Sequence, residues 1–242
     1  MRSPAEVSPR ASSADGRRTR ALGDGALLLD WPSATDSEAN RKARSIAEHL
    51  EQSSPQGFQD CVVGARSLLL VFDPLRFDPG AALRMARFWE SDFASLALPA
   101  LHEIPVCYGS TAGIDLEQIA AEKGMGGAEF VRIHSGAEYR VAFLGFTPGF
   151  GYLTGLPEAL ASQRLATPRL SVPWGSVAIG GSYTGIYPST TPGGWRLIGR
   201  TPISLFDPSR DSPARLSPGD RVKFVPIEQW RFAAMTGGGV RP

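Results

Sequence analysis

Glycine is distributed very unevenly along this chain of 242 residues. Residues 1–100 hold six glycines, whereas residues 101–242 hold 21. Glycine and proline divide a chain into short strands and tight turns, so the glycine-rich part is typical of a β-sandwich or β-barrel. The glycine-poor part instead carries apolar residues at helical spacing. The chain is therefore expected to form two domains, with a boundary near residue 100.

The glycine-poor part is predicted to be a small α+β domain over residues 21–100. Thr35 and Glu38 have the spacing of a capping box ahead of one helix, and Asp78 followed by Pro79 marks the start of a second. With short apolar stretches as strands, the order is strand, helix, strand, strand, helix, strand, which is ferredoxin-like. The four strands are expected at residues 26–30, 61–63, 68–72 and 101–107.

The glycine-rich part, residues 101–235, is predicted to be mostly β-structure after two short helices at 115–123 and 128–135. Residues 1–20 lack apolar periodicity and are expected to be a disordered tail, and residues 236–242 a C-terminal tail. The strands of this domain are expected at residues 139–144, 177–180, 195–198, 203–206 and 221–225.

Charge and cysteine content exclude several classes of protein. The 25 basic and 24 acidic residues leave a net charge of +1, whereas a protein that binds nucleic acid through phosphates carries a clear basic excess. Two cysteines are too few for a disulfide framework, and the three histidines are too scattered for a metal site. The longest strictly apolar run, residues 68–72, is far shorter than a membrane span, so a soluble cytoplasmic protein is expected.

Three glycine-rich segments of the second domain alternate aromatic residues with turn formers: residues 145–153, 180–188 and 191–195. Glycine lets a backbone approach a ligand closely, and flanking Tyr and Trp can form the walls of an apolar pocket. Each segment alone is more simply a tight turn with aromatic rings packed beneath it. Three of them in one domain favour a binding surface.

Few side chains outside these segments are placed for chemistry. His134, at the end of a short helix, is the one histidine positioned for acid–base work, although a hydrogen-bonded structural histidine fits the pattern as well. Arg169 and Arg200 lie in turns, where a guanidinium can hold a carboxylate or phosphate. An arginine in such a turn is more often exposed or part of a structural ion pair.

Several segments of the second domain, which include the glycine-rich ones, together resemble a known family, that of the 5-oxoprolinase B subunits. This family is also called allophanate hydrolase subunit 1 and includes the Kip-type kinase inhibitors. The first domain resembles it more loosely, through residues 22–24 and 67–69, and the resemblance covers residues 21 to about 230. The segments that carry it most closely are residues 131–135, 138–153, 165–168, 175–188 and 192–208.

The resemblance implies a cyclophilin-like β-barrel behind the small α+β domain. It also implies an enzyme that cleaves 5-oxoproline to glutamate with ATP and water, as a complex of A, B and C subunits. The B subunit would share a composite site with the C subunit, and ATP would bind within the assembled complex. No metal, nucleic acid or membrane is implied.

The chemistry of that reaction and the family motifs suggest site residues. Arg169 and Arg200 are the candidate clamp for a carboxylate or phosphate, and His134 and Tyr187 the candidates for proton handling or orientation. Further substrate contacts are expected from Gly181, Thr184 and Trp195. The sequence departs from the family pattern where Tyr, Pro, Ala and Gln would be expected, at Ala65, Gly151, Trp174 and Tyr183 respectively.

Two other functions remain open at this level. The chain could be an inhibitor that binds a sensor histidine kinase, as in the Kip-type branch, and would then need no C-subunit partner. It could also be the carboxyltransferase half of a biotin-dependent urea carboxylase, because Tyr183 resembles the residue at the matching position of those enzymes. Neighbouring genes for the A and C subunits, for a kinase or for a biotin carboxylase would separate the three.

Overall fold

The computed structural model describes residues 11–12, 16–92 and 98–237 of the chain. The chain divides into two compact units, residues 1–98 and 99–242. The structure confirms the predicted combination of helices and strands with a β-barrel.

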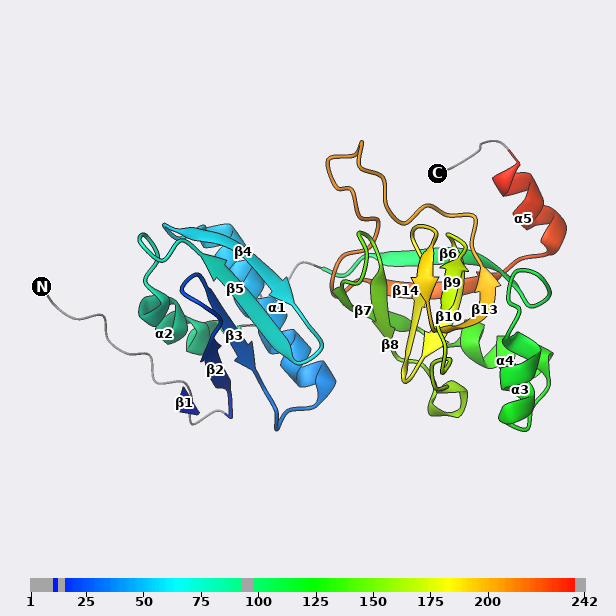
Figure 1. Ribbon diagram of the computed structural model, residues 1–242, viewed down its shortest axis with the longest axis horizontal. Coiled ribbons are helices and arrows are strands. Elements are labelled where there is room, and N and C mark those ends of the chain that lie inside the picture. Colours follow the sequence, from blue (N-terminus) through cyan, green and yellow to red (C-terminus); the bar gives the residue numbers. More distant parts are fainter. Residues whose placement is uncertain (1–10, 13–15, 93–97, 238–242) are drawn as a thin grey trace, which may run out of the picture. The chain divides into compact units, whose positions relative to one another are not determined.

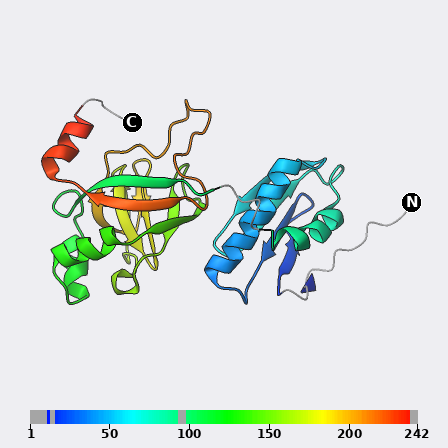
Figure 2. The same ribbon diagram turned by 180° about the vertical axis from the view of Figure 1, so that it is seen from behind.

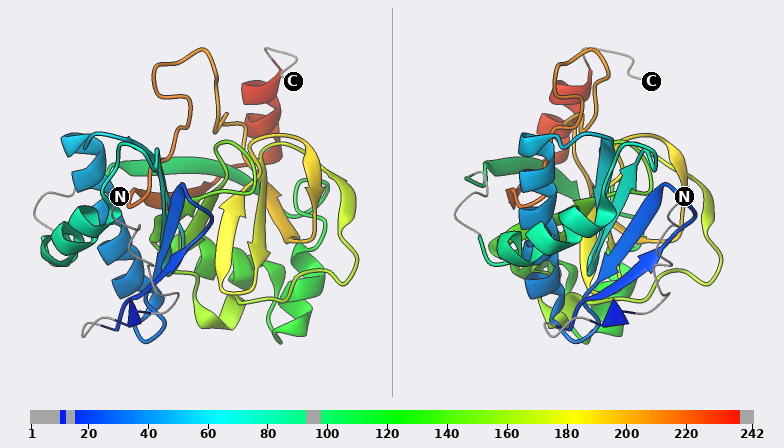
Figure 3. Two further views of the ribbon diagram at one scale, coloured as in Figure 1. Left: turned by 60° about the vertical axis from the view of Figure 1, so that its left-hand side comes forward. Right: turned by 90° about the vertical axis from the view of Figure 1, so that its left-hand side faces the viewer.

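The N-terminal unit is a five-stranded antiparallel sheet with the strand order β1-β2-β3-β5-β4. Its two helices, α1 (Asp36–Ser53) and α2 (Pro79–Trp89), lie against one face of the sheet (Figure 2; Figure 3). The strands are β1 (Ala11–Ser12), β2 (Arg18–Ala21), β3 (Ala26–Asp30), β4 (Phe58–Val63) and β5 (Ser67–Phe72).

Both helix starts of this unit follow the sequence signals. The Thr35 hydroxyl accepts from the backbone N–H of Glu38, and the Glu38 carboxylate accepts from the backbone N–H of Thr35, so the capping box is complete. Asp78 caps α2, with Pro79 in its first turn. The core between helices and sheet is aliphatic and aromatic, with Leu27, Leu29, Ala43, Ile46, Leu50, Leu68, Leu70 and Phe72 all buried.

Two sequence expectations for this unit are wrong, and one missed strand explains both. Residues 18–20, assigned to a disordered tail, form β2 together with Ala21 and pair with β3, and Arg17 of the same expected tail is buried. The strand expected at 101–107 as the last of the ferredoxin-like order instead belongs to the barrel. β2, rather than that strand, pairs with β3 in the sheet. The residues of β2 are mostly exposed and polar, so the strand gives no apolar signal in the sequence. Residues 1–10, 13–15 and 238–242 of the expected tails lie outside the described residues.

The C-terminal unit is a closed seven-stranded barrel, with the order β10-β11-β8-β7-β14-β6-β13. A parallel pairing joins β6 to β14, and the interior is filled by apolar side chains such as Ile104, Val177 and Phe224. The barrel strands are β6 (Leu101–Tyr108), β7 (Tyr139–Leu144), β8 (Gly151–Thr154), β10 (Ser176–Gly180), β11 (Tyr183–Ile186), β13 (Arg196–Arg200) and β14 (Arg221–Pro226).

Several elements surround the barrel. The helices α3 (Leu116–Glu122) and α4 (Gly127–Gly136) lie together beside it, and α5 (Gln229–Thr236) follows the last strand (Figure 1). β9 (Arg169–Val172) and β12 (Thr191–Gly193) form a separate two-stranded ribbon, and a short 3-10 turn covers Glu158–Leu160. The strand expected at 203–206 does not form, and Phe206 makes only an isolated bridge to Ala214.

Candidate functional site

The three glycine-rich segments meet around one cavity of about 150 Å³ in the C-terminal unit. Each segment contributes to its wall, and the loop before β9 closes a further side. The sequence expectation that these segments form a common surface is therefore met in the geometry. The cavity is lined by Phe146, Phe150, Tyr152, Arg164, Leu165, Pro168, Tyr187, Gly193, Gly194 and Trp195.

Phe150 is the centre of an aromatic cluster that builds the cavity wall. Its ring is buried and lies edge-on, 5.1–5.4 Å between ring centroids, to Tyr152, Tyr187 and Trp195. Such edge-to-face contacts stabilise aromatic packing beyond the area that they bury. Tyr183, a departure from the family pattern, extends the cluster by packing edge-on against Tyr152. The wall is thus rigid and largely apolar.

Two glycines make room for these rings. A Cβ on Gly193 would lie 2.4 Å from the Tyr187 hydroxyl, and a Cβ on Gly180 would lie 2.5 Å from the Trp195 ring. Both contacts are far closer than van der Waals distance, so larger residues would displace the rings. The turn interpretation and the pocket interpretation of these segments therefore both hold, because the packed rings are themselves the cavity wall.

Arg164 supplies a positive charge at this cavity, and the sequence analysis missed it. Its guanidinium carbon lies 5.6 Å from the centroid of the Trp195 ring, a cation–π geometry. Two backbone hydrogen bonds between Ser162 and Gly181 hold its loop against the barrel. Gly181, predicted to contact substrate, adopts φ +68° and provides this anchor, and it does not line the cavity. Arg164 carries no signal in the sequence because it is an exposed arginine in a polar loop.

Tyr187 places the one buried phenol of the cavity wall close to positive charge. Burial raises the pKa of its hydroxyl, while the backbone N–H of Trp195 and the nearby Arg164 and Arg169 guanidinium groups oppose that rise. The hydroxyl is therefore protonated at neutral pH and is a hydrogen-bond donor. Tyr187 and Trp195 are the two predicted site residues that line the cavity.

Arg169 acts behind the cavity wall. Its Nη2 is 2.7 Å from Oδ1 of the buried Asp115, and its Nη1 donates to the Trp195 carbonyl at 3.4 Å. The other Asp115 oxygen accepts from the backbone N–H of Leu197 at 2.7 Å. This network fixes the strand that follows Trp195, so Arg169 is a positioning residue rather than the predicted carboxylate clamp.

His134 and Thr184 do not line the cavity; both are fully buried in the barrel unit. The Thr184 hydroxyl donates to the Ala178 carbonyl, so we assign Nε2 of His134, 3.2 Å away, as donor to that hydroxyl and Nδ1 as acceptor from Tyr108. Burial lowers the pKa of His134 to about 3. A sealed, neutral imidazole with both nitrogens occupied cannot exchange protons with a substrate, which corrects its predicted role.

Arg200 also stands apart from the cavity lining. Its guanidinium carbon lies 5.2 Å from the ring centroid of Trp174 and 5.9 Å from that of Phe232, and its Nε donates to the Trp174 carbonyl. It therefore attaches α5, which carries Phe232, to the barrel. Arg200 is a structural cation here and not the second half of a substrate clamp.

Phe146 lies at the cavity in a strained backbone conformation. Its φ is +70°, in the left-handed region that an aromatic residue rarely adopts, and 59% of the residue is exposed. Strain of this kind costs about 1–3 kcal/mol and is concentrated at functional sites.

Among the described residues, no group of three or more His, Cys, Asp or Glu side chains could hold a metal ion. The helices of this part of the chain are also too short or too polar to cross a membrane.

The chain is similar to known proteins over most of its length. The family described as "Carboxyltransferase domain, subdomain C and D" matches residues 17–216. The chain is 41% identical over 209 residues to the 5-oxoprolinase B subunit of Escherichia coli O157:H7, an alignment that covers 86% of this chain and 95% of that protein.

Solved structures show the same fold. The crystal structure of TTHA0988 is 36% identical, with a TM-score of 0.75, over 90% of this chain and 41% of that one. The chain thus spans about two fifths of TTHA0988. The K. lactis urea amidolyase, at 22% identity and a TM-score of 0.70 over 95% of this chain and 16% of that one, shares the fold.

Proposed function

Because the chain belongs to the family of 5-oxoprolinase B subunits, we propose that it is the B subunit of a 5-oxoprolinase, which converts 5-oxoproline, ATP and water to glutamate, ADP and phosphate. The observation that carries this proposal is the match to a 5-oxoprolinase B subunit over 95% of that protein's length. The complex would also contain homologues of the A and C subunits. A complex that consumes ATP would work in the cytoplasm.

The substrate sets clear chemical demands. 5-Oxoproline is a five-membered lactam that bears a carboxylate, and its amide bond is stable towards water. Transfer of the terminal phosphoryl group of ATP to the amide oxygen would release ADP and activate the ring carbonyl carbon. Water would then add to that carbon, the ring C–N bond would break, and phosphate would leave to give glutamate. A binding site for this compound needs apolar walls for the ring, a cation for the carboxylate and a donor near the oxygen that gains charge.

The barrel cavity supplies each of these groups. Phe150, Tyr152 and Trp195 provide the apolar wall, Arg164 the cation and Tyr187 a protonated hydroxyl. We assign Arg164 to the substrate carboxylate and Tyr187 to orientation of the ring amide. In these roles, Arg164 stands in place of the expected Arg200, and Tyr187 acts without the expected His134.

The size of the cavity limits what this chain can bind there. Its volume of about 150 Å³ is half or less of the roughly 300–1,000 Å³ of pockets that hold drug-sized ligands. It suits a small ring compound and excludes a nucleotide. We therefore propose that ATP binds elsewhere in the complex, and that the C-subunit homologue completes the site beside the exposed Phe146.

Reconstitution tests the proposal. The chain would be co-expressed with its A- and C-subunit homologues, and the purified complex assayed for glutamate formed from 5-oxoproline. We expect the B and C homologues to elute together in size-exclusion chromatography, and glutamate to form only with ATP and all three chains. Separate elution without glutamate formation would reject the proposal, and a chain that inhibits kinases would bind its kinase without these partners.

A second candidate function rests on the family description, which names a carboxyltransferase domain. The urea amidolyase likeness is of fold alone. A carboxyltransferase would transfer a carboxyl group from carboxybiotin to urea and would show no dependence on 5-oxoproline. The same purified complex, assayed with carboxybiotin and urea, distinguishes the two functions.

A further inference from the structure

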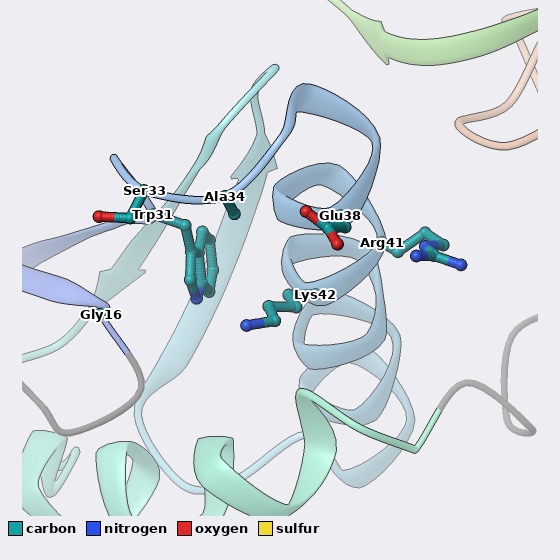
Figure 4. A pocket seen from close by; sticks show the side chains of 7 residues that line it. All are labelled: Gly16, Trp31, Ser33, Ala34, Glu38, Arg41 and Lys42. Atoms are coloured by element: carbon teal, nitrogen blue, oxygen red, sulfur yellow. The ribbon is translucent and has the colours of Figure 1, made fainter.

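A second cavity, of about 430 Å³, lies in the N-terminal unit at the start of α1 (Figure 4). It is separate from the barrel cavity of the proposed function, which lies wholly in the other unit. Its volume falls within the roughly 300–1,000 Å³ typical of ligand sites. The residues that line it are Gly16, Trp31, Ser33, Ala34, Glu38, Arg41 and Lys42.

Trp31 presents at this cavity a buried donor that has no partner among the described residues. Only 1% of the residue is exposed, and its ring packs in the core between helices and sheet. Its indole Nε1 has no hydrogen-bond partner among the described residues. Buried Trp N–H groups normally have a partner, and leaving one without it is unfavourable. A ligand oxygen would supply the missing acceptor.

Lys42 places a positive charge beside this donor. Figure 4 shows the Lys42 ammonium and the indole nitrogen of Trp31 directed towards the same space, with the Arg41 guanidinium directed away. Glu38 is the one acidic residue of the lining, and its Oε2 is engaged by the Thr35 backbone and hydroxyl in the helix cap. Lys42 is therefore the cation that faces this space, and the positive end of the α1 dipole adds to its effect.

The turn that carries Trp31 is held rigidly. Nη2 of Arg66 donates to the backbone carbonyls of Pro32 and Ala34, the latter at 2.6 Å, and lies 3.4 Å from that of Trp31. One guanidinium thus binds three carbonyls of the turn that positions the indole. Such preorganisation reduces the entropy lost on binding.

We propose that this cavity binds a small organic oxyanion, a carboxylate or a phosphate ester. One ligand oxygen accepts from Trp31 Nε1, and the ligand charge is neutralised by Lys42. The indole nitrogen is buried, so a ligand oxygen reaches it only when neighbouring side chains move. The site is independent of the barrel cavity and does not rest on the proposed reaction.

Nuclear magnetic resonance of the full chain tests this directly, because an indole N–H resonance moves downfield when the group donates a hydrogen bond. The five tryptophans give five indole signals, and Trp31→Phe identifies the one of interest. The probes are glutarate for the carboxylate arm and glycerol 3-phosphate for the phosphate arm. We expect a saturable downfield shift of the Trp31 signal with at least one probe, and the probe that acts identifies the anion class.

The matched variants are Lys42→Met, which removes the charge, and Arg87→Met, which removes an exposed charge of the same unit outside the cavity lining. Lys42→Met should weaken binding at least tenfold, and Arg87→Met should leave it unchanged. An unmoved Trp31 signal with both probes, or equal binding by Lys42→Met and the wild type, overturns the proposal. If Trp31→Phe fails to fold, the Lys42→Met titration still decides, since binding rather than activity is measured.

Discussion

The buried ion pair between Arg17 and Glu90 gives a sharp prediction about the N-terminal segment. Arg17 and Glu90 are 3% and 5% exposed, and the guanidinium also lies 3.4 Å from the Leu83 carbonyl. Arg17→Ala leaves the Glu90 carboxylate buried without this cation. Removing one partner of a buried pair costs up to about 3–5 kcal/mol, which for a unit of this size lowers the melting temperature by up to about 15–25 °C.

Urea unfolding followed by tryptophan fluorescence measures this loss, because Trp31 and Trp89 report on the N-terminal unit. The matched control is Arg20→Ala, whose side chain is 54% exposed and lies 3.6 Å from Asp30. That variant should lose less than about 1 kcal/mol. Replacing Arg17 and Glu90 together by Met should restore most of the stability, because the buried charge is then gone.

A loss in Arg17→Ala no larger than that in Arg20→Ala would refute the reasoning. Residues before 21 would then behave as the detachable tail that the sequence predicts. The structure makes the opposite prediction for a chain that begins at residue 22, which lacks both β2 and the Arg17 contact.

Three further predictions concern the barrel. Burial lowers the pKa of His134 to about 3 in the folded chain, whereas the unfolded chain binds a proton at this histidine below its ordinary pKa of about 6.5. The free energy of unfolding should therefore fall by up to about 1.4 kcal/mol per pH unit as the pH drops from about 6.5 towards 3. Urea unfolding at about pH 7, 5.5 and 4.5 measures this fall, and a flat profile contradicts it. Arg169→Met should destabilise the barrel by about 3 kcal/mol or more, because Asp115 stays buried without its cation, and equal urea midpoints would contradict this. Gly193→Ala should displace the Tyr187 hydroxyl and raise the KM of the complex for 5-oxoproline, whereas a KM equal to that of the wild type would show that the ring does not contact substrate.

Local signals were the part of the fold that sequence could predict. The Thr35–Glu38 capping box and the Asp78–Pro79 start each depend on contacts within a few residues, so the pattern contains the whole interaction. β2 pairs with β3 in a local hairpin, but its residues are mostly exposed and polar, so no apolar alternation marks the strand. The burial of Arg17 just before it depends on Glu90, 73 residues away in the chain, and a contact of that range leaves no local pattern.

The site residues likewise divide into those that the sequence could predict and those that depend on the folded barrel. Aromatic residues alternating with glycine identified Tyr187 and Trp195, because close ring packing requires glycine nearby. His134 appeared available in sequence, but closure of the barrel buries it between Tyr108 and Thr184. Arg164 could not be found, because only the folding of its loop onto Gly181 brings an ordinary surface arginine to Trp195.

The most direct test of the assigned site is the KM for 5-oxoproline of the reconstituted complex carrying Arg164→Met. The matched control is Arg132→Met, which removes an exposed arginine paired with Glu129 on α4. If Arg164 holds the substrate carboxylate, its loss removes a charge-assisted hydrogen bond of about 1.5–3 kcal/mol, so KM should rise about tenfold or more while the control stays at the wild-type value. A KM unchanged by Arg164→Met, in a complex that still forms glutamate with ATP, would contradict the account.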